Sequence, residues 1–135
     1  MSVNTRGQQV QRDVLAILRR ERAPLSAYKV LAEMRRATPK MAPTTIYRAL
    51  AALIKAGRVH KLESLNAFIA CRSGKQDHSA VLSICDECGQ VEETAAPEVV
   101  EALSTLAGRS GFRPVRHVIE LRGQCASCEN EEVSP

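Results

Sequence analysis

The chain has 135 residues, which fits one domain or two small domains that share a linker. The formal net charge of +4 divides unevenly: residues 1–66 hold 13 Lys and Arg against 4 Asp and Glu, whereas residues 67–135 hold 6 against 11. No run of 18 apolar residues occurs, and the first 13 residues lack an apolar segment, so we expect a cytoplasmic protein without a membrane span or signal peptide. The basic half is typical of a protein that binds a polyanion, although an arginine-rich solvated surface would have the same composition.

Three amphipathic helices are predicted in the basic half. Residues 8–22 place apolar side chains at helical spacing, and Ser26 is suited to cap a second helix over residues 26–37. A third helix is predicted to begin near Pro43, which suits a first helical turn, and to end at Gly57, which suits the position after a helix. The apolar pattern then changes.

Residues 58–71 alternate with a period of two, which predicts a β-hairpin with a turn at residues 64–66. Three helices followed by a hairpin are the elements of a winged helix-turn-helix domain. In such a domain the third helix enters the major groove of DNA with its N-terminal residues against the base edges.

The exposed face of this third helix carries candidate DNA-binding side chains: Thr44, Thr45, Tyr47 and Arg48. Arg48 is the strongest candidate for a base contact, because one guanidinium group can donate two hydrogen bonds to one guanine. Thr44 and Thr45 are predicted to bind phosphate or to cap the helix. Tyr47 is as well suited to packing between helices as to contacting DNA.

The acidic half predicts a second domain of mixed structure. The expected elements are strands at 79–85, 89–94 and 115–125, a helix at 97–112, and a frayed acidic tail at 129–135. The chain is therefore expected to be an α+β protein, with a winged-helix domain over residues 1–71, a hinge over 72–79 and a small α/β domain over 80–135. Strand edges in the second domain are available for pairing across a two-fold axis, so we expect a homodimer.

Four of the five cysteines form two C-x-x-C pairs, Cys85 with Cys88 and Cys125 with Cys128. Two such turns supply four thiolates, which is the ligand set of a tetrahedral structural zinc site. The 36 residues between the pairs leave room for a helix and a strand, so the metal would link the end of the second domain to its middle. A redox dithiol and unrelated free thiols are the alternatives.

A second group of metal-binding side chains lies outside these pairs. His60 and Cys71 lie on the two arms of the predicted hairpin, His78 lies in the hinge, and Glu92 and Glu93 follow the first C-x-x-C pair. Two imidazoles, one thiolate and one carboxylate would make a second tetrahedral site, suited to a metal-sensing switch. The alternatives are histidines that are simply exposed or packed, and a cysteine that serves as a small apolar residue.

Longer stretches of the sequence resemble a known family. The segments PTTIYRAL (43–50), HKLESLNAF (60–68), HSAVLSICDECGQVEE (78–93) and GQCASC (123–128) resemble the ferric uptake regulator family, and within it the zinc uptake regulator branch. The resemblance covers roughly residues 8–128. It implies a dimeric, zinc-dependent DNA-binding repressor with an N-terminal winged helix and a C-terminal α/β dimerisation domain.

The resemblance also implies two zinc ions per chain, one structural and one regulatory. The structural site corresponds to the four cysteines of the C-x-x-C pairs. The regulatory site corresponds to His60, Cys71, His78 and Glu93, which selects Glu93 over its neighbour. For DNA contact, the resemblance implies Arg48 together with Tyr28.

The chain departs from parts of the family pattern. Iron- and peroxide-sensing relatives have a histidine-rich cluster where this chain has only QDHS (76–79), which argues against iron sensing. Some relatives have a third metal site with a histidine at the position of His117. Its partner histidines are missing here, so we expect His117 to be an ordinary strand residue.

The predicted function is repression of zinc uptake and homeostasis genes by a dimer that binds operator DNA when its regulatory zinc is bound. A sensor of iron, manganese, nickel or peroxide is one alternative, although the thiolate of Cys71 favours zinc over harder metals. A DNA-binding module with structural zinc alone is another. A zinc enzyme is disfavoured because four protein ligands leave no open coordination position and no deaminase signature is present, so we expect no small-molecule substrate.

Overall fold

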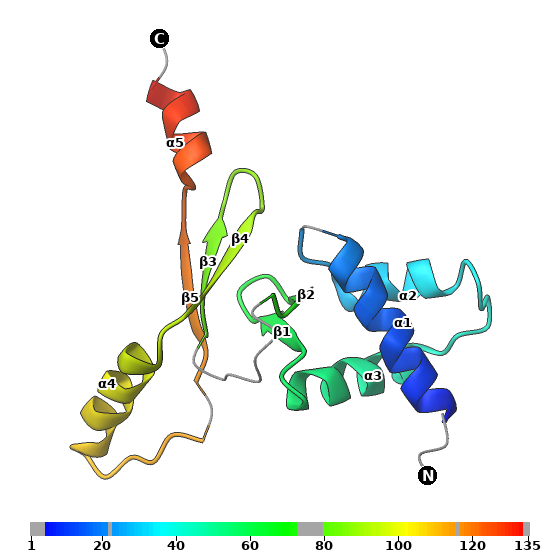
Figure 1. The fold of residues 1–135 in the computed structure, drawn as a ribbon, viewed down its shortest axis with the longest axis horizontal. Coiled ribbons are helices and arrows are strands. Elements are labelled where there is room, and N and C mark those ends of the chain that lie inside the picture. The colour runs from blue at the N-terminus through cyan, green and yellow to red at the C-terminus, as the bar shows by residue number, and fades with distance from the viewer. Residues whose placement is uncertain (1–4, 22, 73–79, 116, 134–135) are drawn as a thin grey trace. The chain divides into compact units, whose positions relative to one another are not determined.

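The computed structural model describes residues 5–21, 23–72, 80–115 and 117–133, and it divides the chain into two compact units, Met1–Gln76 and Asp77–Pro135 (Figure 1). The first unit contains α1 (Arg6–Arg20), α2 (Ala27–Met34), α3 (Pro43–Lys55), β1 (Val59–Leu62) and β2 (Ala67–Ala70). The second unit contains β3 (Ala80–Cys85), β4 (Val91–Ala95), α4 (Pro97–Gly108), β5 (Ile119–Gly123) and α5 (Ala126–Val133). None of the described helices is long and apolar enough to cross a membrane.

Side-chain caps fix where the first two helices begin. Thr5 and Gln8 form a capping box, in which each side chain accepts a hydrogen bond from the other residue's backbone N–H at 3.1 Å. This box starts α1 two residues before the predicted start. The Ser26 hydroxyl accepts a hydrogen bond from the backbone N–H of Lys29 at 3.1 Å, so Ser26 caps α2 as predicted.

The core of the first unit is aliphatic and lies between its helices and its hairpin. α1 packs against α2, α3 and β2, and the residues that lose nearly all solvent contact include Val14, Val30, Ile46 and Leu50. Burial of each such side chain contributes about 1.5 to 3 kcal/mol of favourable transfer free energy. The first unit therefore has a continuous core of its own.

The predicted hairpin is confirmed. β1 and β2 pair antiparallel, with Val59 opposite Ala70 and Leu62 opposite Ala67, and Asn66 takes the left-handed backbone conformation (φ 50°) in the turn. Leu25 forms an isolated antiparallel bridge with Phe68 of β2 through two backbone hydrogen bonds, of 3.0 and 2.8 Å. Three helices followed by this sheet confirm the winged helix.

The second unit contains a three-stranded sheet in the order β4–β3–β5, together with α4 and α5. β3 pairs antiparallel with β4 and parallel with β5, and the parallel connection passes through α4. Leu82 and Ile84 are its large buried aliphatic side chains in the part of the chain that the structure describes. The α+β prediction is confirmed, and this unit has little apolar core.

Three predicted boundaries in the second unit are wrong. The helix expected to reach residue 112 ends at Gly108, because the chain turns at Gly111, where φ is 82°. The strand expected from residue 115 begins only at Ile119. The tail expected to fray at residues 129–135 instead contributes α5, which continues to Val133.

Candidate metal centre

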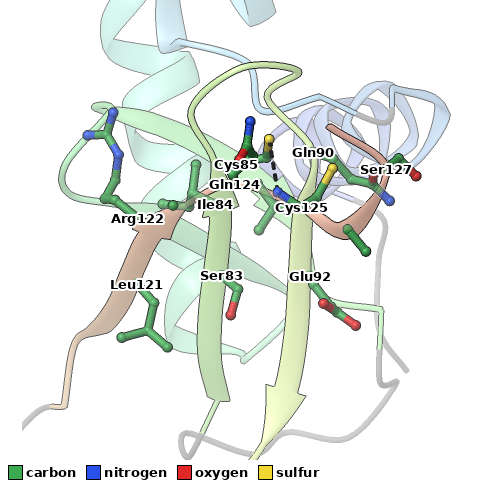
Figure 2. Close-up of a pocket in the computed structure, with 13 residues that line it drawn as sticks. Ser83, Ile84, Cys85, Gln90, Glu92, Leu121, Arg122, Gln124, Cys125 and Ser127 are labelled. Atoms are coloured by element: carbon green, nitrogen blue, oxygen red, sulfur yellow. Dashed lines mark hydrogen bonds between the residues drawn. The ribbon is translucent and has the colours of Figure 1, made fainter. Parts of the chain in front are cut away.

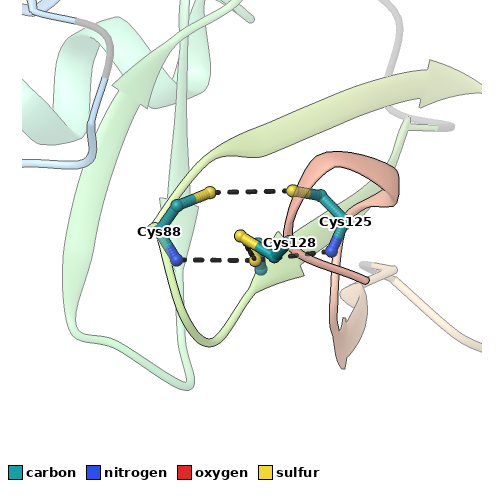
Figure 3. Close-up of side chains that lie close together, drawn as sticks. Cys88, Cys125 and Cys128 are labelled. Atoms are coloured by element: carbon teal, nitrogen blue, oxygen red, sulfur yellow. Dashed lines mark hydrogen bonds between the residues drawn. The ribbon is translucent and has the colours of Figure 1, made fainter. Parts of the chain in front are cut away.

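The four cysteines of the two C-x-x-C pairs form one cluster. Cys85 ends β3, Cys88 lies in the turn before β4, and the other pair lies at the end of β5 and in the first turn of α5. The Sγ atoms of Cys85 and Cys128 are 3.7 Å apart, and those of Cys88 and Cys125 are 3.8 Å apart (Figure 3). All four ligand atoms lie within 4.8 Å of one another. The turns thus bring together sulfurs that are 43 and 37 residues apart in sequence.

The spacing of these sulfurs fits a tetrahedral metal site. Four sulfurs placed about 2.3 Å from one central ion, as in a zinc–thiolate site, would be separated from each other by about 3.8 Å. A disulfide would instead require a sulfur–sulfur distance of about 2.05 Å, and all four cysteines are free thiols. The cluster therefore has the spacing of a zinc–thiolate site rather than that of a disulfide.

The electrostatics of the cluster also call for a cation. The backbone N–H groups of Cys88 and Cys125 point at the Cys85 sulfur from 3.5 and 3.4 Å, and they lower the pKa of that thiol to about 6. The Cys125 thiol, together with burial, raises the pKa of the Cys128 thiol well above its ordinary value. Four thiolates so close together repel one another, so a divalent cation is needed to stabilise the fully deprotonated cluster.

Two residues of the predicted second metal site meet on the hairpin. Cys71 follows β2, and its backbone N–H donates to the carbonyl of Arg58 at 2.8 Å, which extends the β1–β2 ladder by one pair. The two-residue alternation then places His60 and Cys71 on the same face of the hairpin. A ligand nitrogen of His60 lies within 4.8 Å of the Cys71 sulfur, and both side chains are half-buried.

The other two predicted ligands, Glu93 and His78, come from outside the hairpin. Glu93 lies on β4 in the second unit, opposite Leu82, and is half-buried. Glu92 points to the opposite face of the same sheet and is exposed, so the two glutamates cannot serve one site together. His78 lies outside the described residues.

The face of α3 that carries the candidate DNA-binding side chains is exposed to solvent. Tyr47 is 60% exposed and the α2 residue Tyr28 is 78% exposed, so the alternative that Tyr47 packs between helices is wrong. Thr44 and Arg48 are exposed and Thr45 is half-buried. The N-cap of α3 is Ala42, and this end has no side-chain cap, so the alternative that a threonine caps the helix is wrong as well.

His117 lies just before β5 rather than within a strand, which corrects the prediction made for it. Its Nε2 lies 2.9 Å from the Ser104 hydroxyl of α4. This contact links α4 to the segment that enters β5, and it gives His117 a role in packing.

Sequence reasoning missed two polar contacts beside the cysteine cluster. Arg122 Nε donates to Asp86 Oδ1 at 2.6 Å, and Gln124 Nε2 donates to Glu87 Oε1 at 2.8 Å. Both acceptors occupy the two middle positions of the first C-x-x-C turn. Arg122 and Gln124 also line a pocket of about 490 Å³, which lies beside Cys85 and Cys125 (Figure 2). Only the side-chain geometry could reveal these contacts, because the pairs are 36 and 37 residues apart.

A winged helix with an exposed polar reading face and a second unit built around four thiolates define a metal-binding DNA-recognition protein. The chain belongs to the ferric uptake regulator family, whose pattern matches residues 4–122. It is 40% identical over 121 residues to the zinc uptake regulation protein of Escherichia coli K12, a match that covers 89% of this chain and 71% of that protein.

Solved structures agree with this assignment. A zinc uptake regulator complexed with zinc and DNA is 38% identical and superimposes with a TM-score of 0.87, covering 96% of this chain and 87% of the other. Holo XcZur is 37% identical, with a TM-score of 0.82 and coverage of 90% and 84%. The predicted resemblance to the zinc branch of the family is confirmed.

Proposed function

We propose that this protein is a zinc-responsive transcriptional repressor that binds operator DNA as a homodimer and controls zinc uptake and homeostasis genes. The observation that carries the proposal is the similarity, over nearly the whole chain, to a zinc uptake regulator complexed with zinc and DNA. The four-sulfur cluster adds independent support, because its spacing suits zinc.

The DNA-binding role is supported by the surface of the first unit. Arg48 and Tyr47 are exposed on α3, and Tyr28 is exposed on α2. We assign Arg48 to a guanine edge, and Thr44 and Thr45 to phosphate.

Two zinc ions per chain are part of the proposal. Cys85, Cys88, Cys125 and Cys128 would hold the structural ion, and zinc bound there supplies a rigid tetrahedral link between two turns. The regulatory ligand set is His60, Cys71, His78 and Glu93. The half-buried His60 and Cys71 pair on the hairpin supports this set.

The regulatory ligands come from the hairpin, from the proposed hinge at residues 72–79 and from β4. Occupancy of the site would therefore couple the winged helix to the second unit. A ligand shifts a conformational equilibrium only through its different affinity for the two states, and four ligands from three segments provide such a difference. We infer that metal binding selects the DNA-binding arrangement in this way.

The homodimer is supported by an exposed apolar surface on the second unit. α4 has no fully buried residue, and Val99, Leu103 and Leu106 lie on one face of it with more than 40% of their surface exposed. Val118 and Leu121 are exposed near and on the edge strand β5. We infer that a second copy covers this surface; a monomer in sedimentation experiments at micromolar concentration would contradict the inference.

One experiment can find the operator sequence and test the proposed function. A random duplex library is selected with the zinc-loaded dimer, and the affinity for the enriched duplex is then measured by fluorescence anisotropy with zinc and after mild chelation. Tight binding that weakens at least tenfold on chelation is expected. Equal affinity in both conditions would refute the zinc response.

A sensor of another metal is the second candidate, because the wider family includes ferric uptake regulation proteins. The same anisotropy assay with Fe²⁺, Mn²⁺ and Ni²⁺ separates the two. The soft Cys71 thiolate favours zinc over the harder ions. The chain's relatives are named as regulators rather than as enzymes, and we propose no catalytic activity.

A further inference from the structure

The two turns that carry the cysteines are joined by side chains as well as by a common metal site. Arg122 Nε and Nη2 both approach Asp86 Oδ1, at 2.6 and 2.5 Å, and Gln124 Nε2 donates to Glu87 Oε1 at 2.8 Å. We call these four residues the clasp. Its donors come from the end of β5, and its acceptors are the two residues between Cys85 and Cys88.

Two backbone hydrogen bonds also join these turns in the described residues, and one of them is the contact of the Cys125 N–H with the Cys85 sulfur at 3.4 Å. The Asp86 N–H donates to the Gly123 carbonyl at 2.8 Å, which extends the β3–β5 pairing by one hydrogen bond beyond Cys85. After that point, Ala126, Ser127 and Glu129 are exposed, and Cys128 is the buried side chain among residues 126–129. Apolar packing therefore does little to hold the second C-x-x-C turn against the first.

We propose that the clasp positions the two C-x-x-C turns for the metal and slows release of the ion from the four-cysteine site. A site whose ligands are already close together when the metal is absent loses less conformational entropy on binding. If one cysteine detaches, the clasp keeps its turn within reach, so that religation competes with escape of the ion. The four residues are thus positioning residues rather than ligands, and the inference does not depend on DNA binding.

Arg122 also compensates part of the negative charge of the metal site. Four thiolates around one divalent ion carry a net charge of −2, and Asp86 and Glu87 add two further negative charges beside them. Arg122 brings a cation to this acidic turn. Both side chains of this pair are about half exposed (45% and 48%), so solvent limits the strength of the interaction and the expected effects are modest.

The test measures release of zinc from the intact dimer to a chromogenic chelator in excess. Asp86→Asn and Arg122→Gln are each expected to release the four-cysteine zinc roughly two to five times faster than the unaltered protein. The double variant should be no faster than the faster single variant, because both substitutions break one contact. Arg122→Lys keeps the charge and should recover part of the slow release. Arg113→Gln removes an exposed arginine charge elsewhere in the same unit and should change nothing.

A spectroscopic measurement separates positioning from ligation or loss of folding. With Co²⁺ in the site, the absorption bands that report tetrahedral thiolate coordination should be the same in all variants, because the four ligands are intact. Unchanged bands with faster release support the clasp. Release rates equal to that of the unaltered protein would overturn it, as would fully multiplicative effects in the double variant. Altered cobalt bands would overturn it too, since they would mean that the substitutions distort the site itself.

Discussion

Replacement of Cys128 with serine is expected to unfold the second unit and leave the first unit folded. Cys128 is buried, and its sulfur lies 3.7 Å from that of Cys85. Serine removes one of four thiolates from the cluster, and a hydroxyl is not among the ligands that structural zinc sites use. The site then loses its metal, and the second unit loses the link between its two turns.

The expected loss of stability follows from a comparison of apolar burial with zinc binding in the second unit. Leu82 and Ile84 are the large buried aliphatic side chains in the described part of the second unit, and their burial contributes roughly 3 to 6 kcal/mol in total. Zinc binding to structural sites of this kind contributes about 10 to 16 kcal/mol in small peptides. On these figures the metal contributes roughly two to five times as much as the burial of these two side chains. The first unit has a continuous aliphatic core and no ligand of the four-cysteine site.

Hydrogen–deuterium exchange with mass spectrometry measures the two units separately. In Cys128→Ser, amides of β3 and β5 should exchange at nearly the unfolded rate, whereas buried amides of α1 and α3 should keep their protection. Ser127→Ala, at the exposed neighbouring position, is the matched control and should behave like the unaltered protein. Full protection of β3 and β5 in the serine variant would refute the reasoning that the metal dominates this unit.

Four further predictions concern separate parts of the molecule. Arg48→Ala should weaken binding to the selected duplex by about 1 to 3 kcal/mol and relax specificity at one base pair, measured by anisotropy. Lys55→Ala removes a charge at the other end of α3 and should leave specificity at that base pair unchanged. Cys71→Ser should retain its far-UV circular dichroism but lose the zinc dependence of DNA binding, and unfolding of this variant would contradict the division into two sites. Leu50→Ala should lower the free energy of unfolding of the first unit by about 2 to 5 kcal/mol in urea, because the side chain is only 1% exposed. Zinc retention, measured by native mass spectrometry, should fall as the pH is lowered from 8 to 5, because protons compete with the metal for each thiolate. Even the Cys85 thiol, with a pKa of about 6, becomes protonated at pH 5. Retention independent of pH would contradict a thiolate site.

The sequence predicted most of the first unit, because its local signals agree with its packing. The α3 pattern left Arg48 on the exposed face, and the structure agrees, with Ile46 and Leu50 buried on the other side of the helix. The start of α1 was missed because the capping box at Thr5 precedes the apolar repeat. Polar reciprocal hydrogen bonds of this kind leave no trace in hydrophobic periodicity.

The second unit was harder to predict, for physical reasons that differ between elements. α5 has no apolar stripe, so its sequence looks like an acidic tail; the Glu129 N–H nevertheless donates to the Cys125 carbonyl at 2.9 Å and starts the helix. The C-x-x-C spacing did predict which sulfurs gather. It could not predict the contact between Arg122 and Asp86, because side-chain pairing across a parallel crossover depends on the register of β3 and β5.

The strand order β4–β3–β5 also has a consequence for how the protein is made. The helices and strands described in the first unit all lie within residues 6–70, so the nascent chain can fold this unit while synthesis continues. The second unit must wait, because β3 lacks its parallel neighbour until β5 has been translated. The 36 residues between Cys88 and Cys125 correspond to roughly 2 to 7 seconds at typical elongation rates of about 5 to 20 residues per second. During that interval Cys85 and Cys88 have been translated and their two partner cysteines have not. The structural ion can therefore be bound by all four thiolates only near the end of synthesis, after the first unit has been translated.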